Sequence, residues 1–552
     1  MKRKRLLVML TMILALSTVL AACGNNNKSS NEAGNAGNGQ TAKEQVLRIN
    51  LSAEPPTFDP AQAQDSQANT VLKLMYEGLT RMNDNGEQVP GVASEWEVSP
   101  DGLQYVFKLR QDAKWSNGDP VTANDFVFAW ERALNPAAAA LYAYQLYYLK
   151  NAEAYNTEEI TDFSQVGVKA TDDYTLEVTL ENPAPYFLSL TSFYTYYPVH
   201  KSVEGNEAWA TNKDSMIVNG PYTMTNWTTG QKIEVTKNDN YWDKDNIKMS
   251  KIAMSLVNSG ASELLSYKNG ELDYAGKPNG EIPTDQIEAV KKELADEYSA
   301  PGIASTYYYE FNVTEEPFDN EKIRKAFAMS VNRKDLVEKV TMGGQIPAYG
   351  FVAPGIKGEN DEYRNEYPDN YFQENVEEAK KLLEEGMAEK GYTTLPEITL
   401  IYNSSESHKK VALAIADMWQ KNLGVTVKTE NQEWGVFLEN RQNLNYQIAR
   451  AGWSSDYNDP MSFMDMWVTN GGNNDAGFSN AEYDALIKEA YQTQDNAARM
   501  TAMSKAEKIL IQDNQVLMPL YYYTNEYLIK PNLKGVSLDF SGGVDFSRAY
   551  FE

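Results

Sequence analysis

The segment 398–430 constrains the fold more than any other part of the chain. It reads ITLIYN, a short polar joint, SHKKVALAIADMWQKNLG and then VTVKTE. The two outer pieces are strand-like and rich in β-branched residues, whereas Val411, Ile415 and Leu423 recur near helical spacing. A helix in the middle would end at Gly424. A strand, a helix and a second strand in this order predict a parallel pair joined by a right-handed crossover.

Helices and strands alternate along the rest of the chain as well. Residues 121–134, VTANDFVFAWERAL, place Thr122 and Asp125 at capping-box spacing and continue as an amphipathic helix. Such interspersed elements predict α/β domains, and roughly 500 residues beyond position 46 predict more than one of them. The other predicted elements are strands at 174–180 and 231–237 and helices that begin near 319 and 479.

The amino-terminal end indicates export. Four basic residues precede the apolar run Leu6–Leu20, which is fifteen residues long, whereas a bilayer span needs about 20. The following Leu-Ala-Ala-Cys23 resembles the bacterial lipobox, which implies cleavage before Cys23 and a lipid on that residue. The alternative is an ordinary signal peptide with an incidental cysteine. We predict a signal peptide at 1–22 and a lipidated Cys23 with a flexible tether at 23–45.

The tether and the cysteine count set further limits. Residues 24–42, GNNNKSSNEAGNAGNGQTA, offer almost nothing to bury and would reach roughly 25 Å as a random coil. The body would therefore stay close to the membrane surface. Cys23 is the only cysteine, which excludes an intrachain disulfide. No later segment has 18 apolar residues in a row, so the sequence predicts no other membrane span.

The chain is strongly acidic. Its formal net charge is −27, and loss of the leader removes four positive side chains and no acidic ones, which gives −31. Such a chain should be repelled by nucleic acid phosphates. Two interpretations of the charge remain: solubility outside the cell, or a field that favours cationic solutes.

The sequence is poor in catalytic and metal-binding patterns. Its only histidines are His200 and His408, and with Cys23 committed to lipid no cluster of nitrogen and sulfur ligands can form. HExxH, Walker A and GxSxG patterns are absent. Paired carboxylates, such as Glu310 with Asp456, leave a glycosidase-like hydrolase as an alternative. We predict a protein that is not an enzyme and needs no cofactor or metal.

Several long motifs resemble one known family. They are similar to the oligopeptide-binding lipoproteins of ABC importers, and the resemblance covers essentially the whole mature chain. The motifs are FKLRQDAKWSNGDPVTANDFVFAWERAL (107–134), NGPYTMTNW (219–227), YYYEFN (307–312), the 398–435 unit with its NQEW, RAGWSSDYNDPMSF (450–463) and YYYTNEYLIKP (521–531).

The resemblance implies a two-lobed α/β fold of the periplasmic-binding-protein type (type II), with an additional α/β domain and a hinge between the lobes. A first lobe would comprise 46–76, 202–304 and 524–552. The additional domain would be 77–201 and the second lobe 305–523. Hinge closure around a ligand is a known class of conformational change.

The resemblance also implies how a peptide would be held. Asp456 would form a salt bridge to its α-ammonium, because a buried charge needs a partner; the alternative is a turn or capping residue. Gly452, Trp453 and Ser454 would pair with the ligand main chain as an added strand, with the segment from Gln64 to Ser66 on its other side. Trp453 and Trp434 would wall side-chain pockets, unless they are plain core residues.

Further residues match ligand-contacting positions of the family. Arg450, with Arg441 nearby, would meet the carboxylate of short peptides, and His408 would lie further along the ligand or else be a residue near a helix start. Tyr142 would cover the ligand main chain. Tyr308 and Glu310 share one strand face and match pocket positions, whereas Tyr307, Tyr309 and Phe311 would be core. The sequence departs from the family pattern at Thr341, in place of a lysine, and at Gln64, in place of an acid. Either shorter peptides would be preferred, or the carboxyl end of the ligand would project into solvent.

The implied function is an extracellular receptor, lipid-anchored at the outer face of the bacterial cytoplasmic membrane. It would act as a monomer that captures short peptides and delivers them to the permease subunits of an ABC importer. A specialised receptor for a signalling or cell-wall peptide is the alternative.

Overall fold

The computed structural model describes residues 45–83, 87–206 and 208–552. The chain divides into Met1–Lys43 and a body from Glu44 to Glu552. The predicted signal peptide, Cys23 and almost all of the tether lie outside the described residues. Among the residues that are described, no helix is both long and apolar enough to cross a bilayer.

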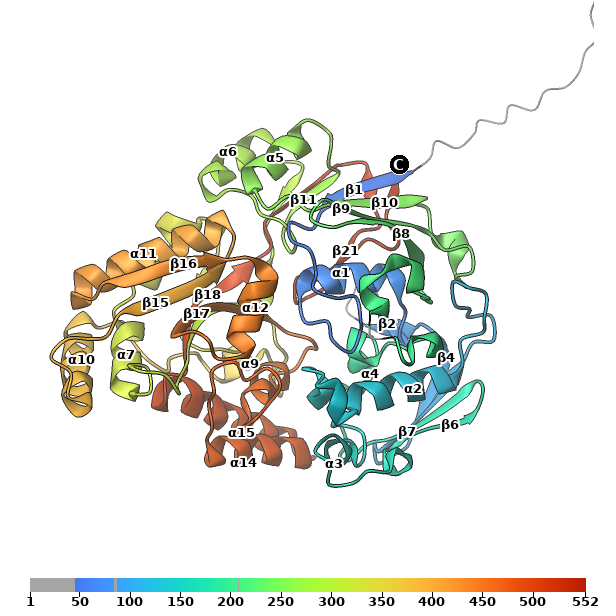
Figure 1. The fold of residues 1–552 in the computed structure, drawn as a ribbon, viewed down its shortest axis with the longest axis horizontal. Helices are drawn as coiled ribbons and strands as arrows, with labels where there is room; N and C mark the ends of the chain where they lie inside the picture. Colours follow the sequence, from blue (N-terminus) through green and yellow to red (C-terminus); the bar gives the residue numbers. More distant parts are fainter. Residues whose placement is uncertain (1–44, 84–86, 207) are drawn as a thin grey trace, which may run out of the picture. The chain divides into compact units, whose positions relative to one another are not determined.

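Three distant parts of the chain build the first group of sheets (Figure 1). The strand order is β1-β10-β9-β8 in one sheet and β11-β19-β12 in a smaller one. Leu47, Ile49 and Ile252 point into a common core. All seven strands fall within the ranges predicted for the first lobe, whose boundaries stay a prediction. The strands are β1 (Val46–Asn50), β8 (Tyr222–Thr228), β9 (Lys232–Lys237), β10 (Lys251–Ser255), β11 (Tyr274–Gly276), β12 (Tyr298–Ser299) and β19 (Tyr527–Ile529); the helices beside them are α1 (Ser66–Met75), α5 (Gly260–Lys268) and α6 (Ile287–Glu293).

An antiparallel sheet of order β4-β5-β7-β6 lies within the predicted additional domain. The predicted helix at 121–134 is α2 (Ala123–Leu134), and Thr122 and Asp125 form the expected capping box. The predicted strand at 174–180 is β7 (Thr175–Thr179). The remaining elements are β2 (Thr80–Met82), β3 (Gln88–Pro90), β4 (Ala93–Val98), β5 (Gln104–Leu109), β6 (Val168–Asp172), α3 (Ala152–Asn156) and α4 (Phe187–Leu190).

The largest sheet has the order β14-β18-β13-β17-β15-β16. Its far edge confirms the unit predicted at 398–430, because β15 (Ile398–Asn403) and β16 (Val427–Gln432) pair in parallel and α11 (Glu406–Leu423) joins them. Gly424 caps this helix with a φ of 72°. The other strands are β13 (Gly302–Phe311), β14 (Ile346–Pro347), β17 (Ile448–Ser454) and β18 (Leu517–Thr524).

Helices cover this sheet, and the expected helices near 319 and 479 are α7 and α14. The helices are α7 (Glu321–Met329), α8 (Arg333–Leu336), α9 (Tyr363–Glu366), α10 (Val376–Lys390), α12 (Trp434–Gln442), α13 (Met461–Met464), α14 (Ala481–Gln492) and α15 (Asn496–Lys508). Two small hairpins pair β20 (Leu533–Lys534) with β23 (Tyr550–Phe551) and β21 (Ser537–Leu538) with β22 (Val544–Asp545).

Two neighbouring strands carry the chain between the first group of sheets and the largest one. β13 begins three residues after β12, and β18 ends three residues before β19. The two strands pair with each other along the centre of the large sheet. Tyr307, Tyr309 and Phe311 of β13 are fully buried in the core formed with α7 and α11, which confirms that prediction.

Candidate functional site

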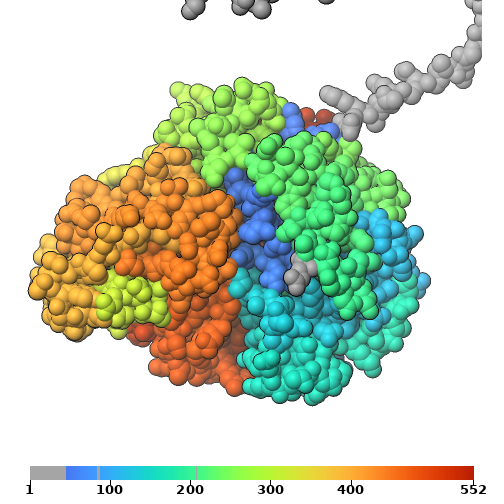
Figure 2. All heavy atoms as spheres, viewed as in Figure 1, coloured from blue at the N-terminus to red at the C-terminus, as the bar shows by residue number. Residues whose placement is uncertain are grey.

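A cleft with a volume of about 690 Å³ lies where the first group of sheets, the 77–201 region and the large sheet meet. Figure 2 shows the orange part of the chain meeting the blue, teal and green parts along a seam. This volume falls within the usual range for ligand sites, ~300–1,000 Å³.

The structure brings most of the predicted site residues to the walls of this cleft. Tyr308 and Glu310 are the exceptions, because both are fully buried and neither lines the cavity. The predicted residues that do line it are Gln64, Ser66, Tyr142, His408, Trp434, Arg441, Arg450, Gly452, Trp453, Ser454 and Asp456.

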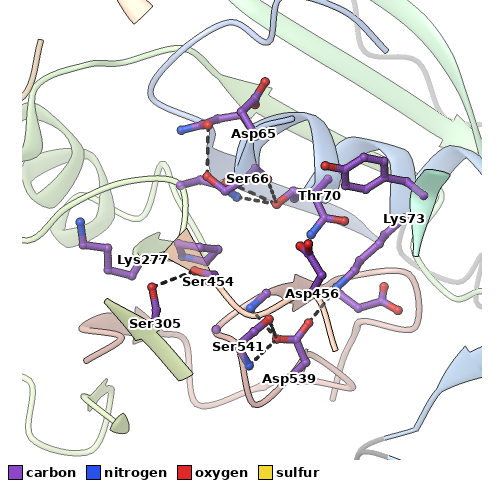
Figure 3. A pocket seen from close by; sticks show the side chains of 18 of the residues that line it. Asp65, Ser66, Thr70, Lys73, Lys277, Ser305, Ser454, Asp456, Asp539 and Ser541 are labelled. Atoms are coloured by element: carbon purple, nitrogen blue, oxygen red, sulfur yellow. Dashed lines mark hydrogen bonds and ion pairs between the residues drawn. The ribbon is translucent and has the colours of Figure 1, made fainter. Parts of the chain in front are cut away.

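Asp456 follows the end of β17 and faces the cleft (Figure 3). Its Oδ2 accepts a hydrogen bond of 2.6 Å from Nε2 of Gln145, and its main-chain N–H donates to Oγ of Ser462 at 2.8 Å. Among the described residues, Asp456 has no cationic partner. Burial, and secondly the charge of Asp465, raise the pKa of the Asp456 carboxyl well above its ordinary value. A positively charged group that entered the cleft beside this carboxyl would therefore stabilise its ionised form.

The strand that leads to Asp456 leaves one edge open. From Arg450 to Ser454, β17 pairs with β13 on one side. On the other side β15 pairs with β17 only at Ile448 and Ala449, and the described residues provide no strand partner beyond that point. The main-chain groups of Gly452, Trp453 and Ser454 therefore border the cleft at an open sheet edge, which can accept a further strand.

Aromatic rings wall the cleft beside this edge. Trp453 stacks on Tyr142 with 6.2 Å between ring centroids and 19° between planes, and its Nε1 donates to the carbonyl of Ser462 at 2.7 Å. Trp434 is half-buried, and its Nε1 has no hydrogen-bond partner among the described residues. Both tryptophans thus lie at the wall with part of their surface free, and their role as walls of side-chain pockets stays a prediction.

A basic region lies around His408. Arg450 donates from Nη2 to the hydroxyl of Tyr523 at 2.7 Å and stands 4.9 Å from the ring centre of Tyr307. Arg450 has no acidic partner within 4.0 Å in the described part of the chain. Burial, together with the positive charges of Arg450 and Lys277, lowers the pKa of His408 well below its ordinary value. His408 is therefore neutral at pH 7.

Arg441 differs from Arg450 because its charge is already neutralised. Its Nε lies 2.5 Å from Oε1 of Glu310 and its Nη2 lies 3.0 Å from Oδ2 of Asp475. Glu310 is thus committed to an internal ion pair. Tyr308 packs edge-on against Phe351, with 5.1 Å between ring centroids.

The segment from Gln64 to Ser66 enters α1 on the opposite wall. Asp65 caps this helix by accepting from the main-chain N–H of Ala68 at 2.8 Å, and burial raises the pKa of its carboxyl to about 6. Gln64 accepts a bond of 2.9 Å from Nε2 of Gln442, which reaches across the cleft. Thr341, in contrast, is buried outside the cleft and donates to Oε1 of Gln345 at 2.8 Å.

Three residues that line the cleft, or that hold a lining residue in place, were not predicted from the sequence. Gln145 holds Asp456 from a 3-10 turn, and no spacing signals it. Asp65 directly precedes a helix, so its capping role could have been found. Lys277 lies between a short strand and Pro278, where no local pattern marks it.

Other contacts close the cleft across its two sides. The hydroxyls of Tyr148 and Tyr457 are 3.0 Å apart, Oγ of Ser405 donates to Oε2 of Glu281 at 2.8 Å, and Nζ of Lys410 lies 3.1 Å from Oδ1 of Asp285. Two α/β bodies joined by paired crossing strands, with a polar cleft between them, define a solute-binding protein of the two-lobed type.

The chain belongs to the family of bacterial extracellular solute-binding proteins, family 5, whose middle-region model matches residues 87–475. This family assignment confirms the predicted class, a binding protein rather than an enzyme. The chain is 43% identical to the oligopeptide-binding protein OppA of Bacillus subtilis (strain 168), over 98% of both chains.

Solved structures confirm the fold. Listeria monocytogenes OppA bound to peptide is 35% identical, with a TM-score of 0.85 over 92% of this chain and 99% of that one. The murein tripeptide binding protein MppA of Escherichia coli is 32% identical, with a TM-score of 0.86 over 92% and 99%. MppA in an unliganded open form gives a TM-score of only 0.60, with 32% identity over 92% and 98%. The arrangement described here is therefore not the open one.

Proposed function

We propose that this protein is a receptor for short peptides that serves an ABC importer. The observation that carries the proposal is the combination of an open strand edge at Gly452–Ser454 with a carboxyl, Asp456, that lacks a cationic partner just beyond the edge. An extended peptide laid along β17 would add a strand and place its α-ammonium at Asp456. The names of the related OppA proteins, which bind oligopeptides, support the same ligand class.

The opposite end of such a ligand carries a carboxylate. Arg450 lies on the same strand as the open edge, four residues before Ser454, and residues of a strand rise about 3.3 Å each. A peptide of a few residues therefore spans the distance from Asp456 toward Arg450. Main-chain pairing depends little on side-chain identity, so many sequences are accepted, with water filling the pockets.

Blocking the ligand's amino end tests the proposal. An acetylated tetrapeptide should bind more weakly than the free one by roughly 2–5 kcal/mol, because a buried charge pair loses one member. Asp456→Asn should abolish that difference, while the exposed control Asp417→Asn should keep it. Isothermal titration calorimetry on ligand-free protein measures both. Equal affinity of the wild type for free and acetylated peptides would contradict the proposal.

Asp456→Asn also has an expected effect on the empty protein. A carboxyl whose pKa is raised in the folded state weakens the fold above its unfolded pKa. The melting temperature of the empty variant should therefore equal or exceed that of the wild type at pH 7. A marked fall would show that Asp456 is structural.

We propose further that the receptor is held at the outer face of the membrane by a lipid on Cys23 and passes its cargo to permease subunits there. The basic and apolar leader followed by Leu-Ala-Ala-Cys supports this location. Cys23→Ala should release the protein from the membrane fraction without changing its affinity for peptide. Unchanged sedimentation with membranes would rule out the lipid anchor.

A further inference from the structure

Ion pairing divides the basic side chains of the cleft into two groups. Six lysine and arginine side chains line it. Two of them, Lys277 and Arg450, have no acidic partner within 4.0 Å among the described residues. The other four are ion-paired: Lys73 with Asp539 at 2.9 Å, Arg81 with Glu77 at 3.3 Å, Arg441 with Glu310 at 2.5 Å, and Arg548 with Asp243.

Lys277 stands on a fixed piece of backbone. It directly follows β11, and its main-chain N–H donates to the carbonyl of Glu526 at 3.0 Å. Its own carbonyl accepts a bond of 2.5 Å from the hydroxyl of Tyr274. The side chain is half-exposed and borders the cleft, where Figure 3 draws it among the lining residues. The main chain that carries this side chain is therefore fixed by the fold rather than part of a loose loop.

The charge of Lys277 acts inside the cleft. It and Arg450 both lower the pKa of His408, so the charges of both cations act on the same ring. The charge of Lys277 lowers the pKa of Glu526, but burial raises that pKa overall. The Glu526 carboxyl already accepts from Thr524 at 2.6 Å and from Gln345. The cleft thus has two cations, Lys277 and Arg450, that lack an ion-pair partner among the described residues.

We propose that Lys277 forms a second carboxylate-binding site in the cleft, separate from Arg450. The proposal rests on the peptide-binding function proposed above and specifies its ligands. Arg450 meets one carboxylate, and Lys277 is free for another. That carboxylate comes from an aspartate or glutamate side chain of the peptide, or from the chain end of a peptide too long to stop at Arg450.

The physical reason is incomplete neutralisation. A half-buried ammonium has lost part of its hydration and gains a charged hydrogen bond only when a carboxylate arrives in the closed cleft. A lysine or arginine side chain of the ligand at the same place would be repelled. Lys277 therefore favours acidic ligands and selects against basic ones.

The test compares matched peptides on matched variants. Pentapeptides that carry glutamate or glutamine at one position, scanned along the chain, are titrated by calorimetry into ligand-free wild type, Lys277→Met and Lys277→Arg. Lys292→Met, an exposed lysine of α6 in the same lobe, is the control. Each peptide is also used with its carboxyl end amidated, and at lengths from two to six residues.

At one position or length, the wild type should prefer the carboxylate form by about tenfold, as expected for one charged hydrogen bond. In Lys277→Met this affinity ratio should fall to about one, while the affinity for the matched uncharged peptide changes less than twofold. Lys277→Arg and Lys292→Met should keep the wild-type ratio. Dependence on glutamate identifies the side chain as the source, and dependence on amidation of longer peptides identifies the chain end.

A wild type whose only carboxylate preference is for the chain end of short peptides, which Arg450 meets, would overturn the inference while leaving peptide binding intact. A preference at any other position or length that survives in Lys277→Met would do the same. An equal loss for all peptides in Lys277→Met would also overturn it, since the lysine would then be structural. Failure of every peptide to bind the wild type would instead reject the proposed function.

Discussion

Individual charged side chains in the cleft differ in whether a neighbour already neutralises them. Arg441 and Glu310 satisfy each other, whereas Arg450, Lys277 and Asp456 lack a partner of opposite charge among the described residues. The sequence predicts Arg450 as the partner of a short peptide's carboxylate, with Arg441 nearby, but it does not show that Arg441 is already ion-paired. Only the folded contacts separate the internal ion pair from the cation that is open to a ligand.

A second buried acid should tune the pH dependence of binding. Asp465 is 2% exposed, accepts from the hydroxyls of Tyr457 and Tyr491, and raises the pKa of Asp456 by its charge. Burial raises the pKa of Asp465 itself to about 7. Since only the ionised Asp456 pairs with an ammonium, affinity should increase as the pH rises through its raised pKa.

Asp465→Asn should move that increase to lower pH, because one cause of the raised pKa is removed. Dissociation constants measured between about pH 4 and pH 8, where the ligand's amino group keeps its proton, give the profile. The exposed control Asp417→Asn should reproduce the wild-type curve. Superimposable curves for wild type and Asp465→Asn would show that the two carboxyls are not coupled.

At the scale of elements, local patterns were predictable and strand pairing was not. The unit β15–α11–β16 follows from hydrophobic periodicity and a terminal glycine, although β16 begins two residues later than the predicted strand at 425–430. The separation of β17 from β15 depends on residues distant in sequence, so no local signal reveals it. That separation creates the open edge of the site.

The same limit explains which site residues were predictable. Residues 450–456 follow one another in the chain, so one motif indicates them together. Lys277 reaches the cleft from another part of the fold, and Gln145 contacts Asp456 from the 77–201 region. Alternation placed Tyr308 and Glu310 on one face of β13 correctly, but that face packs against other side chains, such as Phe351, instead of opening on the cleft.

At the scale of the whole molecule, the cleft exists only while its walls are held together. Gln145 contacts Asp456, Ser405 contacts Glu281, and Lys410 pairs with Asp285, in each case across the cleft. Aromatic rings also meet across the cleft, as where Tyr186 stacks on Tyr457 with 4.9 Å between ring centroids. A ligand that touches both walls adds contacts that exist only in the closed arrangement and therefore favours it.

Closure should be visible in solution. The radius of gyration of ligand-free protein, measured by small-angle X-ray scattering, should fall when a binding peptide is added, because the walls move together. Asp456→Asn should show no such change at the same peptide concentration. Identical scattering of the wild type with and without bound peptide would contradict closure on the ligand.

The open edge of β17 has a consequence for how cargo leaves. A peptide bound there would form one more strand of the receptor's sheet. It would be held by several main-chain hydrogen bonds rather than by a single strong contact. Such a peptide departs slowly while the two halves remain shut. Release of the peptide would then require a partner protein that opens the two lobes, so that opening and delivery occur in the same step.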